Sequence, residues 1–133
     1  RLGYFLGRVH DALSHVGIAA EYNGGSGVED IVRFGAVYTP HFSDNNFTLL
    51  KIYPAETSGT AGPQVDVFTS QRFTDWLTAS LLVDGNVKPR VVYSEPEVDL
   101  TYNNAALFGQ GRVVWQLGKK LDLQPIVGMK YTF

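Results

Sequence analysis

The chain has 133 residues, 13 acidic and 11 basic side chains, a net charge of −2 and no cysteine. This length suits a single domain spanning residues 1–133. Without cysteine there is no disulfide, thiolate metal site or cysteine nucleophile, and without a basic run the charge disfavours a nucleic acid polymer as partner. No apolar run has the length of a membrane-spanning helix, but this test overlooks transmembrane β-barrels, in which only alternate residues are apolar.

Short segments rich in β-forming residues follow one another along the chain, separated by glycine, proline and asparagine. The predicted strands are 2–10, 15–23, 31–42, 47–54, 64–73, 77–84, 90–102, 107–117 and 121–133. Nine is an unexpected number, because single-chain bacterial barrels have an even number of strands. Either the first segment is not a strand or at least one strand precedes Arg1. The first option has support because helical spacing, typical of an amphipathic helix in a membrane interface, also relates Leu2, Phe5, Leu6, Val9 and Leu13.

The four segments from residue 77 onward alternate most clearly between apolar and polar residues. One face is uncharged and includes Leu81, Val98 and Leu100. The opposite face carries the charged residues Asp84, Glu95, Glu97, Asp99, Arg112, Asp122 and Lys130. Soluble and membrane barrels both alternate in this way, so the pattern alone does not distinguish them.

The ends of the strands favour a membrane barrel. Aromatic residues at the level of one interfacial girdle are Phe73, Tyr102, Tyr131 and Phe133, and Trp115 lies toward the other. Proline and glycine on the apolar face, at positions 96, 109, 111 and 125, suit a lipid-facing surface better than a tightly packed core. We therefore predict an all-β fold, an antiparallel up-and-down transmembrane β-barrel with about eight to ten strands in this chain.

The predicted connections between strands indicate the register of one strand pair and the orientation of the barrel. Pairing Tyr102 with Leu107 across residues 103–106 places Glu97 opposite Arg112, as charge pairing in sheets favours. Short connections are predicted on the side of the C-terminus at 43–46, 74–76 and 103–106, and longer loops on the other side at 24–30, 55–63 and 85–89. Short turns on one side and long loops on the other are typical of bacterial outer-membrane barrels.

Two segments resemble known families. The last eight residues, including Gly128, Tyr131 and Phe133, resemble the assembly signal of bacterial outer-membrane barrels. More broadly, the chain resembles the Tsx-type nucleoside-specific channel family through Tyr22-Asn23-Gly24-Gly25, Ser94-Glu95-Pro96-Glu97, Tyr102-Asn103 and Lys130-Tyr131-Thr132-Phe133. The resemblance implies a bacterial outer-membrane location, contact with the lipid bilayer and the assembly machinery, and a twelve-stranded barrel that passes nucleosides. The chain is shorter than that pattern requires, so we expect a trimmed or an unusually short family member.

In the conducting interpretation, the polar face lines a lumen that admits small polar solutes by passive diffusion without a cofactor. Tyr93 and Phe108 would stack on a base, because every base has a π-face. Hydrogen bonds to ribose hydroxyls and base edges would come from Glu95, Glu97, Asp99, Arg112 and Lys130. The acidic row at spacing two is interpreted as a ladder neutralised by neighbours such as Arg112, rather than as a calcium site.

Three other functions are alternatives to the channel. A closed barrel of eight strands, whose interior is filled by side chains, would have a structural or anchoring role. A soluble lipocalin-like barrel would line a dry cavity with its uncharged face. An enzyme is not expected, because His41 and Ser43 lie two apart on a strand, too far for an easy hydrogen bond, and Ser43-Asp44-Asn45-Asn46 is a turn sequence.

Overall fold

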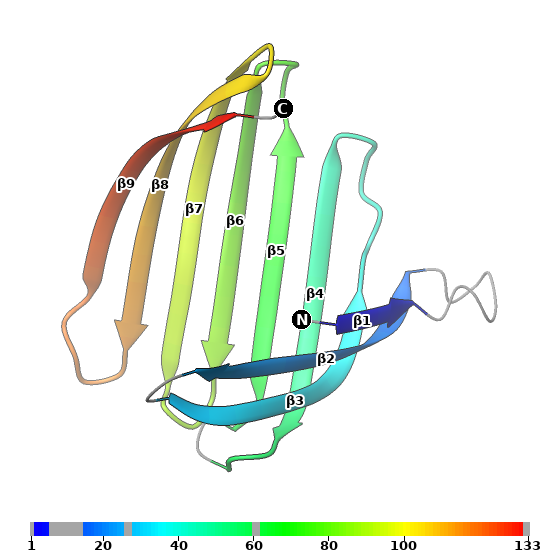
Figure 1. The fold of residues 1–133 in the computed structure, drawn as a ribbon, viewed down its shortest axis with the longest axis vertical. Helices are drawn as coiled ribbons and strands as arrows, with labels where there is room; N and C mark the ends of the chain where they lie inside the picture. The colour runs from blue at the N-terminus through cyan, green and yellow to red at the C-terminus, as the bar shows by residue number, and fades with distance from the viewer. Residues whose placement is uncertain (1, 6–14, 26–27, 60–61, 132–133) are drawn as a thin grey trace.

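The computed structural model describes residues 2–5, 15–25, 28–59 and 62–131. They form one antiparallel sheet in which every strand pairs with its neighbours in the sequence (Figure 1). The nine strands are β1 (Leu2–Phe5), β2 (Val16–Gly25), β3 (Val28–Tyr38), β4 (Asn46–Glu56), β5 (Gln64–Arg72), β6 (Leu77–Asn86), β7 (Val91–Tyr102), β8 (Ala105–Gln116) and β9 (Asp122–Tyr131). The predicted all-β, up-and-down antiparallel class is confirmed.

No helix in the described part of the chain is long and apolar enough to cross a membrane.

The structure of the first segment tests one of the two explanations for the odd strand number, namely that this segment is not a strand. Leu2–Phe5 pairs with Gly17–Ala20 of β2, so the predicted interfacial helix is wrong over these residues. Residues 6–14, which completed that prediction, lie outside the described ranges. The nine strands predicted from alternation match the nine observed strands in order.

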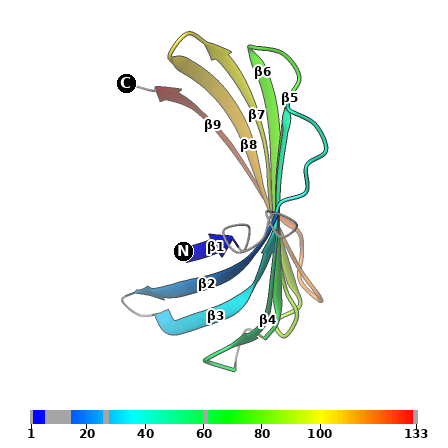
Figure 2. The same cartoon turned by 90° about the vertical axis from the view of Figure 1, so that its right-hand side faces the viewer.

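The sheet curves into a trough and does not close on itself (Figure 2). Its two free edges are β1 and β9, because neither strand has a second neighbour among the described residues. In an up-and-down sheet, successive strands reverse direction, so the first and ninth strands run the same way. These two edges therefore cannot form an antiparallel ladder with each other.

A bulge in β4, where Tyr53 and Pro54 lie opposite the single residue Gly35 of β3, bends the N-terminal part of the sheet. The pairing of β3 with β4 shifts between Phe34 and Ala36, leaving Gly35 at the irregularity. A Cβ atom at Gly35 would lie 1.9 Å from the carbonyl oxygen of Ile52, so only glycine permits this approach of the two backbones. The bend turns β1 to β3 away from the direction of β5 to β8 (Figure 1).

The two faces of the sheet differ in polarity and in exposure. On β7, Tyr93, Glu95 and Glu97 are half-buried, whereas Val98 and Leu100 on the opposite face are exposed by 47% and 45%. Side chains crowd together on the concave side of a curved sheet and diverge on its convex side, so the polar row lies on the concave side. The convex row of β5 to β9 carries no Asp, Glu, Lys or Arg, and its exposed members include Val65, Leu81, Val92, Val98, Leu100, Leu107, Leu123, Val127 and Met129.

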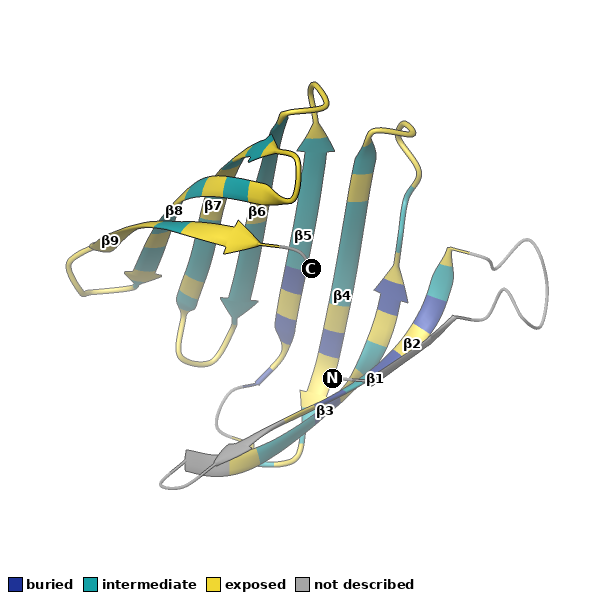
Figure 3. Ribbon diagram, turned by 45° about the horizontal axis from the view of Figure 1, so that its top comes forward, coloured by how far each residue is buried: buried dark blue, intermediate teal, exposed yellow. Residues whose placement is uncertain are grey.

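The apolar core is small and lies on the concave side of β2 to β4. Ala19, Val37 and Tyr53 are buried, and Leu49 packs against them. The bands of buried residues in Figure 3 cross β2 to β5 and do not continue onto β6 to β9. Burial of apolar area is the main favourable term in the folding of a soluble domain, and in the described part of the chain few apolar side chains are buried.

The predicted connection and register between β7 and β8 are wrong. The connection between β7 and β8 is Asn103-Asn104, not residues 103–106, with Asn103 at a φ of 51° that asparagine tolerates. Tyr102 therefore pairs with Ala105, which places Glu97 opposite Gln110 instead of Arg112.

The predicted contrast in loop length between the two ends of the sheet is also absent. The loop 39–45, on the side of the C-terminus, is as long as the loop 57–63 on the opposite side. The predicted long loop at 24–30 is largely strand.

The end of β4 is held by a carboxylate that accepts hydrogen bonds from the following loop. Glu56 Oε2 accepts from the Ser58 hydroxyl and backbone N–H, each at 2.6 Å, and from Gly59 N–H at 2.9 Å. Its Oε1 accepts from Gly62 N–H at 3.0 Å. The Ser58 hydroxyl most of all, opposed by desolvation and helped by the backbone N–H groups, lowers the pKa of Glu56 from 4.5 to about 2.

Replacing Gly35 with alanine is expected to lower the free energy of unfolding by about 1–3 kcal/mol, because its Cβ must push the β4 backbone away. Urea unfolding of the folded chain measures this loss. Gly109→Ala is the matched control, since a Cβ there meets nothing within 4 Å. Equal stability of the two variants would contradict the bulge geometry.

The Glu56 carboxyl is expected to titrate with a midpoint near 2, measured from the NMR shift of its carboxyl carbon. A carboxyl pKa lower in the folded state stabilises that state fully above the ordinary value of 4.5. The contribution is lost as the pH falls from there through about 2. Ser58→Ala should raise the midpoint toward 4.5, because it removes the largest cause of the shift. A wild-type midpoint at the ordinary value would refute the loop geometry.

Candidate functional site

The residues predicted to line a lumen share the concave face of β7, β8 and β9. We call this set the polar wall: Tyr93, Glu95, Glu97, Asp99, Phe108, Arg112 and Lys130. Alternation places them on one side, since side chains two residues apart on a strand point the same way. The structure brings them together in two groups, one around Lys130 and one around Arg112.

The first group joins β9 to β7 across the intervening strand β8. Lys130 Nζ donates to Glu97 Oε1 at 2.5 Å and to Asp99 Oδ1 at 2.8 Å. The two carboxylates have only 18% and 19% of their side-chain surface exposed, whereas the Lys130 side chain is 46% exposed. The two neighbouring acids therefore share one cation, and the group keeps a net negative charge.

The second group corrects the predicted partner of Arg112. Arg112 Nε donates to Glu95 Oε1 at 3.3 Å and to the Tyr93 hydroxyl at 3.0 Å, and its guanidinium lies 5.7 Å from the centre of the Tyr93 ring. The Tyr93 hydroxyl in turn donates to Glu95. The predicted pair with Glu97 is wrong because the β7–β8 register is displaced by two residues. Arg112 and Lys130 form ion pairs with all three acids of the row, Glu95, Glu97 and Asp99.

The ring of Phe108 packs against two residues of β9, Gly128 and Lys130. Phe108 is paired with Gly128, where an added Cβ would lie 2.7 Å from the ring. Lys130 Nζ lies 4.8 Å from the ring centre, within the range of a cation–π contact. Gly128, predicted as part of an assembly signal, therefore also makes room for an aromatic ring on the concave face. Stacking of a base on Phe108 requires Lys130 to move aside.

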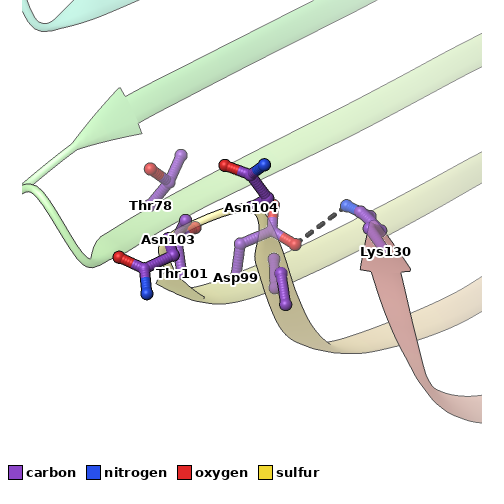
Figure 4. Close-up of a pocket in the computed structure, with 8 residues that line it drawn as sticks. Thr78, Asp99, Thr101, Asn103, Asn104 and Lys130 are labelled. Carbon is purple, nitrogen blue, oxygen red and sulfur yellow. Dashed lines mark hydrogen bonds and ion pairs between the residues drawn. The ribbon is translucent and has the colours of Figure 1, made fainter. Parts of the chain in front are cut away.

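A hollow of about 450 Å³ adjoins the first group at the end of the sheet nearer the C-terminus. Figure 4 shows Asp99, joined to Lys130, together with Thr78, Thr101, Asn103 and Asn104. Hydroxyl, amide, carboxylate and ammonium groups line it, so it offers both donors and acceptors. Its volume lies within the range of roughly 300–1,000 Å³ that small-molecule sites occupy. A smaller hollow of about 180 Å³ lies between Phe68, Glu95 and Glu97 on the same face.

Sequence reasoning missed a second polar group, on the concave side of β2 to β5. Glu21, Arg33, Tyr53, Gln64 and Asp66 are each no more than 5% exposed, and we call them the buried cluster. Arg33 forms an ion pair with Glu21 at 3.8 Å, and the Tyr53 hydroxyl donates to Glu21 at 3.4 Å. The available signal in the sequence was the two-residue spacing of Lys51 and Tyr53, and of Gln64 and Asp66, which places each pair on one face of its strand. This signal was weak, because glycine, alanine and proline interrupt the polar pattern in those segments.

Exposed aromatic side chains collect at the two ends of the strands. Of the predicted girdle, Phe73, Tyr102 and Tyr131 are 62%, 81% and 61% exposed at the end nearer the C-terminus, and Phe133 lies outside the described residues. Trp115 is 45% exposed toward the other end. The structure adds further exposed aromatics to the C-terminal end, namely Tyr38, Phe42 and Trp76.

His41 and Ser43 form no hydrogen bond with each other in the described structure. His41 Nε2 lies 3.5 Å from Asp44 Oδ1, but their side chains are 62% and 99% exposed. Ser43 accepts a turn hydrogen bond from the backbone of Asn46. The described residues also hold no cluster of three or more His, Asp or Glu side chains arranged to bind a metal.

Comparison with protein-family models, with curated proteins and with solved structures finds no match for this chain.

The packing of Phe108 on Gly128 gives a double-mutant test. Gly128→Ala is expected to lower the free energy of unfolding by on the order of 1 kcal/mol, because its Cβ displaces the ring. In a Phe108→Ala background the same change should cost little, giving a coupling of at least about 0.5 kcal/mol between the sites. Urea unfolding of the four proteins measures it. Additive effects would show that the ring does not lie over Gly128.

Proposed function

We propose that the chain forms the wall of an outer-membrane β-barrel through which nucleosides or similar small polar solutes diffuse passively. The observation that carries the proposal is the polarity of the curved sheet. Its convex face is apolar and uncharged over β5 to β9, and its concave face carries the acidic and basic residues. A soluble barrel requires the reverse, with apolar residues inside.

The exposed aromatics support the same proposal. Tyr102 and Tyr131 stand level with each other, because both pair with Ala105 at the end of the sheet. Amphipathic rings favour the headgroup level of a bilayer, where the ring is buried and the hydroxyl stays wet. Trp115 at the opposite end is consistent with a second girdle. A contiguous apolar surface of this extent is otherwise an aggregation hazard in water.

The polar wall supports the choice of solute. The hollow beside Lys130 offers carboxylates, hydroxyls and amides, which match the hydroxyls of a ribose and the polar edge of a base. Glu97 and Asp99 share one cation, so the wall is net negative and disfavours anions such as nucleotides. The ring of Tyr93 is the aromatic surface proposed for contact with the base, with Arg112 as its neighbour.

A closed barrel with a structural role is the second candidate, favoured by the buried cluster. Glu21, Arg33 and Tyr53 are linked to one another and nearly inaccessible on the concave side. Such a network occupies space that a solute would need. The two candidates share the fold and the membrane location, and they differ in conductance.

The membrane location is tested first by extraction. The proposal expects recovery of the full chain only with detergent, and a shift in gel mobility on boiling that reports a folded barrel. Phe133→Ala should reduce the yield of this heat-modifiable form, because it removes the terminal aromatic residue that resembles an assembly signal. Recovery of folded wild-type protein in the soluble fraction would refute the membrane proposal.

Conductance then separates the channel from the closed barrel. Reconstituted in a planar bilayer, the chain is expected to give current steps that a nucleoside blocks and a sugar does not. Arg112→Ala should shift the reversal potential toward greater cation selectivity, since Glu95 loses its partner. Thr69→Ala, on the convex face opposite Thr48, is the control and should leave the potential unchanged. An inserted, heat-modifiable barrel without current would establish the closed alternative.

A further inference from the structure

Basic side chains collect in two neighbouring loops at the end of the sheet opposite the C-terminus. The loop between β6 and β7 carries Lys88 and Arg90, and the loop between β8 and β9 carries Lys119 and Lys120. The two loops lie side by side because β7 pairs with β8 up to Val91 and Gln116 (Figure 1). We call these four basic residues the basic rim.

The two ends of the sheet differ in charge. From β3 onward, the connections at the end of the basic rim are 57–63, 87–90 and 117–121, and none of them contains Asp or Glu. The three connections at the other end contain Asp44 and Asp75 but no Lys or Arg. A separation of this kind favours an anionic partner at one end of the molecule.

Three side chains of the basic rim are available to such a partner. Arg90, Lys119 and Lys120 are exposed, and none of them forms an ion pair within the described part of the chain. The acid nearest to them in the sequence, Asp122, accepts a hydrogen bond from Gln124 at 3.0 Å instead. The positive charge of these three residues is therefore not offset by a direct contact.

Hydrogen bonds hold the two basic loops in place. Leu117 N–H, in the second loop, donates to the carbonyl oxygen of Arg90 in the first at 3.2 Å. Lys88 Nζ donates to the carbonyl oxygen of Gly59, which ties the first loop to the connection after β4 and leaves the lysine charge without a counter-ion. Loops that are already ordered lose less conformational entropy on binding than mobile ones.

The basic rim borders the apolar convex row. Trp115, the last residue but one of β8, pairs directly with Val92, so both belong to that row. Leu117 and Leu121, which flank the two lysines of the second loop, are also exposed. Apolar and aromatic side chains followed by basic ones suit a bilayer interface, where lysine and arginine reach the headgroups and their stems stay in apolar surroundings.

We propose that the basic rim binds the headgroups of anionic lipids in the leaflet at that end of the barrel. This inference rests on the membrane location proposed above and adds to it a lipid class and a side. Arg90 offers a planar fork that matches two oxygens of a phosphate, and Lys119 and Lys120 supply compact charges beside it. The attraction falls off within a Debye length, so the lipids in contact with the rim are the ones enriched.

The two tryptophans of the chain provide one probe at each end of the sheet. The full chain is reconstituted in phosphatidylcholine vesicles, and quenching of its fluorescence by brominated phosphatidylglycerol is compared with quenching by brominated phosphatidylcholine. Trp76→Phe isolates Trp115 beside the basic rim, and Trp115→Phe isolates Trp76 at the other end. We expect phosphatidylglycerol to be preferred about fivefold near Trp115, and neither lipid to be preferred near Trp76.

Neutral substitutions in the basic rim test its charge directly. In the Trp76→Phe background, the combined change Arg90→Gln, Lys119→Gln and Lys120→Gln should abolish the preference, and so should about 1 M sodium chloride, which screens the charges. Lys51→Gln removes a cation from the concave face of β4, is the matched control and should keep the preference. The shift in gel mobility on boiling checks that each variant is folded.

Two outcomes separate this inference from the membrane location on which it rests. Equal quenching of Trp115 by the two lipids in an inserted, heat-modifiable barrel would overturn the inference and leave the membrane location standing. A preference that survives the triple substitution would overturn it as well. Absence of quenching by either lipid at both tryptophans would refute the membrane location, and the inference with it.

Discussion

The two-residue period of polarity along the strands is the constraint on which the rest of this structure depends. It places the acidic and basic residues of β7 to β9 together on the concave face and leaves the convex face of β5 to β9 uncharged. A shift of one residue in any ladder would reverse both faces of that strand. Among the described residues the apolar core is confined to a few side chains around Tyr53, and their burial does not compensate for the exposed convex row. Contact with lipid would complete that burial.

The backbone at Gly35 determines how this patterned sheet is bent. The bulge lets β3 cross close to Ile52, and it turns the N-terminal strands across the trough. That bend gathers Glu21, Arg33 and Tyr53 against one another. Because β1 and β9 run in the same direction, antiparallel closure requires an odd number of further strands between these edges. The size of the enclosed space depends on that number.

Alternation made the strands from β5 onward predictable. Their apolar residues must all fall on one uncharged face, and this restricts where each strand can begin and end. The register between β7 and β8 was not predictable in the same way. Moving the pairing by two residues preserves every face, so polarity does not discriminate between Arg112 opposite Glu97 and Arg112 near Glu95. The length of the Asn103-Asn104 turn decided it, through the left-handed backbone of Asn103. The buried cluster escaped prediction because it depends on the bulge opposite Gly35, which joins segments with weak alternation of their own.

The charged residues of the concave face fall into two groups, one buried and one partly exposed. This difference bears on whether a solute can pass along the trough. In the N-terminal part, Glu21 and Arg33 are shielded from water, and charges of this kind are held by mutual contacts that are costly to break. In the C-terminal part, Lys130 reaches its two acids while its own side chain is 46% exposed, so a solute can compete for it at moderate cost. Exchange of partners by a passing solute is therefore feasible along β7 to β9 and unfavourable along β2 to β4. A solute pathway, if the barrel is open, follows the side of the trough formed by the polar wall.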